Sequence, residues 1–169
     1  MYLNDKKMKR LILMRHGKSS WEYDVSDIER PLKPRGVKDS TLVAEAFKTT
    51  KLDICGIYSS PANRAYSTCK IFTEGIDFPV ENVEIVENLY DFGGSSVIDF
   101  VKSLPEDKKN VMIFGHNHAF TSISNIFGNK FIDNLPTAGL VVLNFDISSW
   151  RNLKKGVTEL MILPRDLKR

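Results

Sequence analysis

The sequence predicts an α/β protein, a three-layer α/β/α sandwich in which a mostly parallel, mixed sheet lies between two layers of helices. Short apolar runs alternate along the chain with segments that carry apolar residues at helical spacing. Several of these runs end in polar residues and glycine, which is typical of strands whose tips face a ligand site. The last two runs have no helical pattern between them, which predicts an antiparallel pair.

Six apolar runs are expected to be strands, because each is short and is bounded by turn-forming residues. They span residues 9–14, 54–59, 83–86, 111–114, 139–145 and 157–163. Four segments are expected to be helices, at residues 36–49, 60–73, 95–104 and 118–127. The second helix is predicted to begin at Ser60-Pro61, since serine is a good N-cap and proline suits the first helical position. Residues 19–34 are polar, contain two prolines and predict a long loop.

Composition narrows the possible classes of protein. A chain of 169 residues suits one domain, residues 1–169, and its net charge of +3 is far from a nucleic-acid-binding signature. No apolar run approaches the ~20 residues of a membrane helix. Residues 1–10 lack the apolar core of a secretory signal, so a cytoplasmic protein is expected. Cys55 and Cys69 lack metal-site spacing and are predicted to be buried free thiols.

The triplet Arg15-His16-Gly17 lies directly after the first apolar run and places a cation and an imidazole at one strand tip. The second run leads into a segment that contains Arg64, in the first helical turn, where the helix dipole favours anions. The fourth run is followed by His116. Parallel strands bring such tips together, and guanidinium and imidazole groups around one point suit a phosphoryl group.

The joint pattern resembles the histidine phosphatase superfamily, and within it the SixA-like phosphohistidine phosphatases. The segments that carry the resemblance are Arg15-His16-Gly17-Lys18-Ser19-Ser20-Trp21, Glu29-Arg30-Pro31-Leu32, Arg35-Gly36, Ser59-Ser60-Pro61 with Arg64, Ala65 and Thr68, and Gly115-His116-Asn117. The resemblance implies a phosphoglycerate mutase-like fold and a single histidine phosphatase domain. It also implies catalysis without a metal or another cofactor.

By this resemblance His16 is the nucleophile and carries a transient phosphoryl group. Its other ring nitrogen is expected to donate to a backbone carbonyl near Gly17. Arg15, Arg64 and His116 are expected to hold the phosphoryl oxygens, with His116 as a cation. The predicted substrate contacts also include Lys18, Ser19 and Asn117.

The general acid is left open by the sequence. Asp91 is the first candidate, because Leu89-Tyr90-Asp91 fits the position of the acid in ester-cleaving relatives, with Glu22, Asp24 and Asp27 as alternatives. A poorly placed acid favours phosphohistidine, since imidazole with a pKa of ~6.5 is a far better leaving group than an alkoxide. Two departures from the family pattern are Lys18 and His118, and His118 is predicted to be a surface residue at a helix start.

Three functions compete at this point. The leading prediction is a phosphatase that acts on phosphohistidine in a protein partner. The alternative is a small-molecule phosphomonoesterase or a phosphoglycerate mutase-like enzyme, for which Lys18, Arg30, Lys33 and Arg35 would supply charge. A non-enzymatic phosphate-binding module is disfavoured, because a binder does not need the nucleophile His16.

Overall fold

A six-stranded sheet runs through the molecule. The computed structural model describes residues 8–168, so residues 1–7 and 169 of the predicted single domain lie outside it. The strands are β1 Met8–Arg15, β2 Gly56–Ser59, β3 Glu84–Ile85, β4 Asn110–Gly115, β5 Leu140–Asp146 and β6 Val157–Ile162, in the order β3-β2-β4-β1-β5-β6. Only β5 runs against the others, which confirms the mostly parallel mixed sheet.

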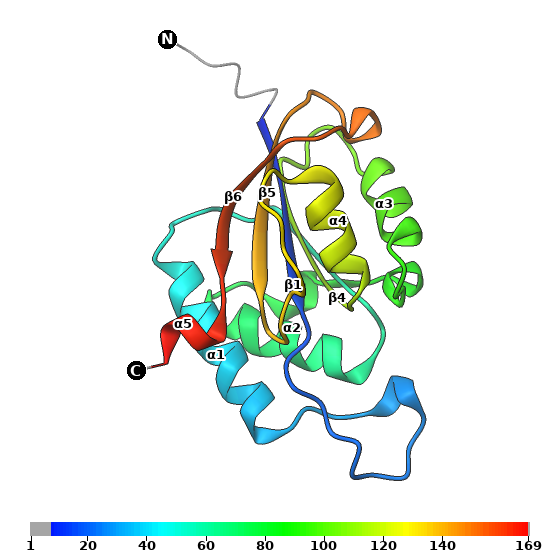
Figure 1. The fold of residues 1–169 in the computed structure, drawn as a ribbon, viewed down its shortest axis with the longest axis vertical. Coiled ribbons are helices and arrows are strands. Elements are labelled where there is room, and N and C mark those ends of the chain that lie inside the picture. Colours follow the sequence, from blue (N-terminus) through cyan, green and yellow to red (C-terminus); the bar gives the residue numbers. More distant parts are fainter. Residues whose placement is uncertain (1–7, 169) are drawn as a thin grey trace.

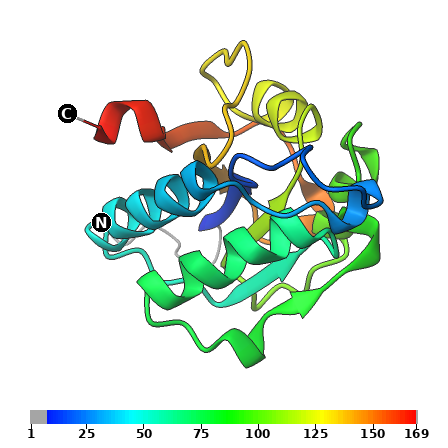
Figure 2. The same cartoon turned by 90° about the horizontal axis from the view of Figure 1, so that it is seen from below.

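Helices cover both faces of this sheet. They are α1 Pro34–Lys48, α2 Asn63–Gly75, α3 Ser95–Lys102, α4 Ala119–Phe127 and the short α5 Pro164–Leu167. α3 and α4 pack on one face, and α1, α2 and α5 on the other (Figure 1), with α1 and α2 side by side (Figure 2). The predicted three-layer sandwich is therefore confirmed. Within residues 8–168 no helix has the length and apolar character that a membrane span requires.

The central strand β1 shows why the chain forms two cores. Leu11 and Leu13 contribute to the core beneath α3 and α4, whereas Ile12 and Met14 contribute to the core beneath α1 and α2. Alternate side chains of a strand point to opposite faces of a sheet, so a continuous apolar run is what a strand covered on both faces requires. The run therefore fixes β1 in the middle of the sheet.

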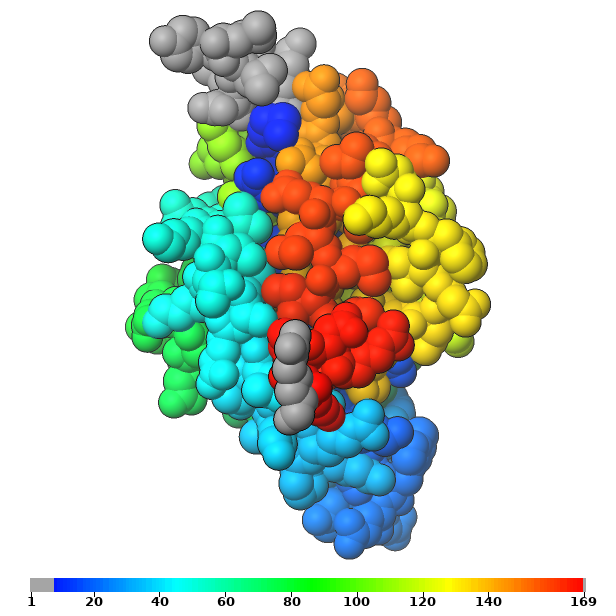
Figure 3. Space-filling model, turned by 60° about the vertical axis from the view of Figure 1, so that its left-hand side comes forward, coloured from blue at the N-terminus to red at the C-terminus, as the bar shows by residue number. Residues whose placement is uncertain are grey.

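The register of the parallel strands brings the predicted site segments together. Arg15 at the end of β1 lies opposite Gly115 at the end of β4, and Ser59 of β2 lies opposite Phe114. The segment that follows β1 projects from the lower end of the molecule before α1 begins (Figures 1 and 3). The tips of β1, β2 and β4 thus lie side by side, at the base of this projecting loop.

Two local expectations were wrong, and one strand is shorter than predicted. α2 begins at Asn63, two residues after Pro61, and Ser60 does not cap it. The short strand expected at residues 83–86 is present as β3, confined to the exposed residues Glu84 and Ile85. Cys55 is exposed, because it lies just before β2 begins, whereas Cys69 of α2 is buried as predicted.

Candidate active site

His16 lies at the centre of the site, with its backbone held on both sides. Its amide N–H donates to the carbonyl of Gly115 at 3.1 Å, and its own carbonyl accepts from Ala138 N–H at 3.0 Å. The imidazole is 8% exposed, and its Nδ1 lies 2.8 Å from the carbonyl oxygen of Gly17. A carbonyl can only accept, so Nδ1 carries the proton and Nε2 keeps its lone pair. The expected contact near Gly17 is confirmed.

Gly17 is required because the backbone of α1 comes very close to it. A Cβ atom at Gly17 would lie 2.7 Å from the carbonyl oxygen of Gly36, and one at Gly36 would lie 2.3 Å from that of Lys18. The Gly17 N–H donates to Thr68 Oγ1 at 2.9 Å, and that hydroxyl donates to the Arg64 carbonyl at 2.8 Å. These contacts fasten the loop that carries His16 to both α1 and α2.

Two arginines approach His16, Arg15 from the tip of β1 and Arg64 from the first turn of α2. Arg15 Nη1 donates to the carbonyl of Leu135 at 2.8 Å. Arg64, the second residue of α2, is 2% exposed, and its Nη1 donates to the carbonyl of Asp27 at 2.6 Å. Both guanidinium groups are therefore fixed by backbone oxygen atoms, in a site where burial makes their charge effective.

His116 lies against His16, with their ring centroids 5.5 Å apart. It is fully buried, and its Nε2 lies 2.8 Å from Ser60 Oγ. The Ser60 hydroxyl oxygen accepts from Ala62 N–H at 3.2 Å. The contact with His116 explains why Ser60 does not cap α2. The rings of Tyr90 and Phe92 lie 5.4 and 4.8 Å from the His116 ring and cover it.

Both histidines are held neutral in the free protein. Burial, followed by the charges of Arg64 and Arg15, outweighs the hydrogen bond to Gly17 and lowers the pKa of His16 to about 4. Burial, followed by nearby His16 and Arg64, lowers the pKa of His116 to about 3. A neutral His16 is what a nucleophile requires. His116 is therefore not a preformed cation in the free protein, because burial and the neighbouring His16, Arg64 and Arg15 outweigh the charge of Asp27.

Three buried nitrogens around His16 have no hydrogen-bond partner within residues 8–168. They are Arg15 Nε, Arg64 Nε and His116 Nδ1. Buried polar atoms are seldom left unpaired, since each costs about 1–3 kcal/mol. These three belong to the residues that were predicted to hold the phosphoryl group. The site is therefore built to receive an acceptor-rich anion.

Asp27 lies in the projecting loop and is bound by several donors. Its Oδ2 accepts from Arg64 Nη2 at 2.9 Å and from the Tyr90 hydroxyl at 2.5 Å, and its Oδ1 accepts from Arg30 Nη1 at 3.1 Å. Burial opposes ionisation, but the hydrogen bonds from Tyr90, Arg64 and Arg30 hold the pKa of Asp27 well below its usual range. Asp27 is a permanent carboxylate, so it is unsuited to donate a proton.

Asp91 is also engaged elsewhere. Its carboxylate accepts from the N–H groups of Gly93 and Gly94 at 3.0 Å and from Val97 at 3.1 Å, at the start of α3. Burial opposes ionisation, but the N–H groups, Val97 first, lower the pKa of Asp91. A general acid must hold a proton that it can give up. These contacts make Asp91 an acceptor at the start of α3 and a poor proton donor in the free protein, and its role as the general acid stays a prediction.

The remaining carboxylates and predicted substrate contacts lie in less suitable environments. Glu22 and Asp24 are exposed, and within residues 8–168 no side-chain hydrogen bond joins them to the site. The Lys18 side chain is exposed to solvent. Ser19 Oγ accepts from Arg30 Nη2 at 2.6 Å. Neither of the last two contacts the buried donors.

The segment after β4 is used to start α4. The Asn117 side chain accepts from Thr121 N–H at 3.1 Å and donates to Asn134 Oδ1 at 2.6 Å, so it serves the fold. His118 is exposed and lies directly before α4, as predicted. In the described chain, no group of three His, Cys, Asp or Glu side chains is arranged to hold a metal ion.

Sequence reasoning gave too little weight to Arg30, Tyr90 and Ser60. Arg30 is 7% exposed, and its Nε donates to the Ser20 carbonyl at 3.0 Å. Its position in the motif Glu29-Arg30-Pro31-Leu32 was a usable signal, whereas Tyr90 and Ser60 act through contacts with distant parts of the chain. Each of the three supports Asp27 or His116.

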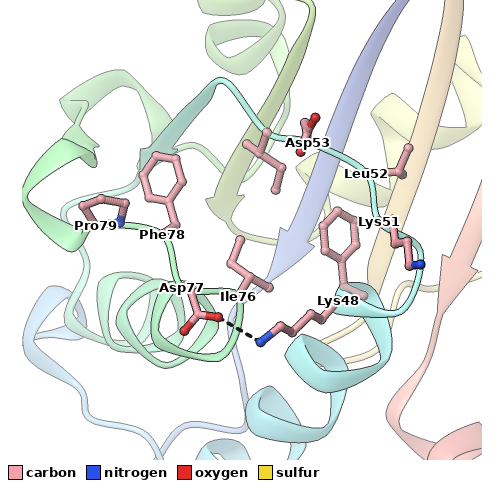
Figure 4. Close-up of a pocket in the computed structure, with 10 residues that line it drawn as sticks. Lys48, Lys51, Leu52, Asp53, Ile76, Asp77, Phe78 and Pro79 are labelled. Carbon is pink, nitrogen blue, oxygen red and sulfur yellow. Dashed lines mark hydrogen bonds and ion pairs between the residues drawn. The ribbon is translucent and has the colours of Figure 1, made fainter.

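A separate cavity of about 350 Å³ lies far from this site. It is lined by residues that precede β2 and by residues that follow α2, so it lies near the amino end of β2 (Figure 4). Lys48 and Asp77 form an ion pair of 2.8 Å beside it (Figure 4). It shares no residue with the site around His16.

Comparison with known proteins identifies the family. The family model of the histidine phosphatase superfamily (branch 1) matches residues 11–94, which include His16, Arg15 and Arg64. The chain belongs to the histidine phosphatase superfamily. Membership supports phosphatase activity and explains why the vacant donors surround a histidine.

The full fold resembles solved members of this superfamily. The protein histidine phosphatase SixA, complexed with tungstate, has a TM-score of 0.79 at 22% identity, over 94% of this chain and 99% of that one. A SixA homologue of Nakamurella multipartitia, described as a putative phosphohistidine phosphatase, has a TM-score of 0.76 at 22% identity over 93% and 96%. An uncharacterized protein of Mycobacterium leprae is 27% identical over 88% of this chain and 96% of its own. The resemblance extends beyond residue 94 and includes the half of the fold that carries His116.

Proposed function

We propose that the protein is a phosphatase that removes the phosphoryl group from phosphohistidine in a protein partner. The observation that carries the proposal is the tautomer of His16, whose Nδ1 is 2.8 Å from the Gly17 carbonyl and whose Nε2 is therefore free to attack. The unpaired nitrogens of Arg15, Arg64 and His116 would receive the phosphoryl oxygens. Arg15 ends β1, His116 follows β4, and Arg64 lies in the first turn of α2, which follows β2, so neighbouring strands of the sheet bring the three together.

The reaction would proceed in two displacements. His16 Nε2 forms a bond to phosphorus, the substrate P–N bond breaks, and the departing imidazole keeps the electron pair and takes a proton from solvent. A water oxygen then bonds to phosphorus, the P–Nε2 bond breaks, and its electron pair returns to His16. Inorganic phosphate leaves, and the surplus proton of the water passes to phosphate or solvent. Binding a dianion also raises the pKa of His116, which makes it a stronger donor in the complex than in the free protein.

The state of the carboxylates supports phosphohistidine over alkyl phosphates. Asp27 is bound by Arg64, Arg30 and Tyr90, and Asp91 caps α3, so neither is a free carboxylic acid. An imidazole leaving group takes its proton readily near neutral pH, because its pKa is ~6.5, whereas an alkoxide needs a positioned acid. The substrate that tolerates this site best is therefore a phosphoramidate.

The cations predicted to hold a small substrate are either engaged elsewhere or exposed. Arg30 donates to Ser20, Ser19 and Asp27. Of the other candidate cations, Lys18 and Lys33 are exposed, and Arg35 is 65% exposed and 3.5 Å from Asp39, so none is fixed in a buried position. A phosphomonoesterase or mutase that selects one metabolite needs several fixed polar contacts to its substrate. This alternative therefore ranks second.

A substrate panel tests the proposal. Wild-type protein and His16→Ala would be incubated with a phosphohistidine-bearing protein and with sugar and glycerol phosphates, and phosphate release would be followed. We expect release from phosphohistidine to exceed release from the esters, and the variant to lose it. Faster turnover of an ester would overturn the substrate assignment, and full activity of His16→Ala would overturn the mechanism.

A further inference from the structure

Asp27 binds Arg64 with two different atoms. Its backbone carbonyl accepts from Nη1 at 2.6 Å and its carboxylate accepts from Nη2 at 2.9 Å. Because both terminal nitrogens of the planar guanidinium bind one residue, Asp27 sets the orientation of the whole group. The Nε–H that remains is buried and unpaired within residues 8–168.

Asp27 is itself held firmly from two directions. It opens a short 3₁₀ turn, Asp27–Glu29, and its carboxylate accepts from Tyr90 on one side and from Arg30 on the other. Arg30 is fastened in turn to the Ser20 carbonyl, and its guanidinium lies 3.3 Å from the centre of the Trp21 ring. The projecting loop therefore forms a rigid support for Arg64.

We propose that Asp27 is a positioning residue for phosphoryl binding, which aims the free edge of Arg64 at the phosphoryl group on His16. The inference rests on the phosphatase function of the site and is independent of whether phosphohistidine is the substrate. In this role Asp27 contacts neither the nucleophile nor the substrate. It acts through the orientation and the charge balance of Arg64, which is 2% exposed and needs a fixed counter-ion.

The competing explanation is that Asp27 occupies the anion site and inhibits it. Two observations disfavour this. The carboxylate uses Nη2, whereas the vacant donor is Nε of the same residue. Both carboxylate oxygens are also bound by Arg30 and Tyr90, so leaving Arg64 would break contacts beyond the one with Arg64. The two explanations predict opposite changes in oxyanion affinity, which makes them separable.

Tungstate affinity, measured by calorimetry on the full chain, is the decisive test because it needs no turnover. In Asp27→Asn we expect the Kd for tungstate to rise about 10–100-fold, since a hydrogen bond to a charged group contributes ~1.5–3 kcal/mol. The KM for a phosphoramidate substrate should rise with it, while the melting temperature stays close to wild type. The matched control is Asp77→Asn, which removes an exposed carboxylate paired to Lys48 at 2.8 Å and should leave the Kd unchanged.

Each outcome decides between the explanations. An unchanged Kd in Asp27→Asn overturns the proposal, and a lower Kd establishes inhibition by Asp27 instead. If Asp27→Asn does not fold, Tyr90→Phe decides, because it removes one donor to the carboxylate and should raise the Kd by about 2–10-fold. Wild-type affinity in Tyr90→Phe then overturns the proposal. If wild-type protein binds tungstate but does not hydrolyse phosphohistidine, the proposed substrate is wrong. The tungstate measurement on Asp27→Asn still tests the role of Asp27.

Discussion

Two ion pairs of nearly equal length lie in opposite surroundings in this protein. Arg64 and Asp27 are 2.9 Å apart at the site, and Lys48 and Asp77 are 2.8 Å apart beside the cavity of Figure 4. The Arg64 side chain is 2% exposed and that of Asp27 41%, whereas those of Lys48 and Asp77 are 58% and 77% exposed. Water screens the second pair and competes for its donors, so its distance says little about its energy.

The difference shows what converts an ion pair into part of a binding site. At the site, burial excludes water, and Arg64 keeps one donor without any partner in the described chain. An unpaired buried donor lowers the stability of the free protein, and a bound anion restores the missing hydrogen bond. Beside the cavity, Lys48 and Asp77 are solvated whether or not a ligand is present. Vacant buried donors therefore identify the site better than the size of a cavity does.

Replacing Arg64 should produce the largest loss of phosphatase activity among the variants of the two ion pairs. Arg64→Ala removes a fixed cation and a vacant donor, so kcat/KM for phosphohistidine should fall by about 10²–10³. Arg64→Lys keeps the charge but loses the planar fork, and we expect most of the loss to remain. Steady-state kinetics with both variants measures this. Full activity in Arg64→Lys would show that charge alone, and not geometry, distinguishes the two ion pairs.

The strand tips were predictable from the sequence, and the support of Arg64 was not. Apolar runs followed by Arg15, His16 and His116 locate the site, because a covered strand must be apolar and its carboxyl end must be polar. The role of Asp27 depends on contacts with Arg64 and Tyr90, which are 37 and 63 residues away along the chain. No local pattern encodes such contacts, so Asp27 was assigned to the candidate acids.

Stability against pH tests the claim that water is excluded from the site. The pKa values of His16 and His116 are about 4 and about 3 in the folded chain, and ~6.5 when unfolded. Below about pH 6.5 the two histidines bind protons in the unfolded chain but stay neutral in the folded chain. The free energy of unfolding should therefore fall as pH decreases.

Each histidine adds a slope that approaches ~1.4 kcal/mol per pH unit. Denaturant unfolding between about pH 7.5 and 5 measures this slope, above the range in which carboxylates such as Asp27 titrate. His16→Gln should lower the slope by up to the ~1.4 kcal/mol per pH unit that one histidine contributes. An unchanged slope in that variant would mean that water reaches the His16 ring.

Asp91 offers a carboxylate with a smaller, structural effect. Asp91→Ala removes the acceptor of three N–H groups at the start of α3, and should cost about 0.5–2 kcal/mol of folding stability. The ratio of phosphohistidine to ester turnover should not change, because the carboxylate is engaged away from the leaving group. A selective loss of ester cleavage would restore Asp91 as the general acid.

Asp91 and Ser60 show the same physical limit of prediction from sequence. Each has a side chain suited to two tasks, and the sequence gives no means of choosing between them. Ser60 is a good N-cap by type, but its hydroxyl is used by His116 2.8 Å away. Asp91 is a good acid by position, but the N–H groups that begin α3 are adjacent and need an acceptor. Tertiary contacts decided both cases.

Removing the ion pair between Lys48 and Asp77 should have the smallest effect on stability and activity. Lys48→Ala, Asp77→Ala and the double variant form a cycle that isolates the coupling between the two side chains. We expect a coupling of about 0.2–1 kcal/mol that declines as salt is added, because both groups are exposed. Phosphatase activity should match wild type in all three variants. A coupling above ~2 kcal/mol, or a loss of activity, would show that the two ends of the sheet are not the separate environments that their exposure indicates.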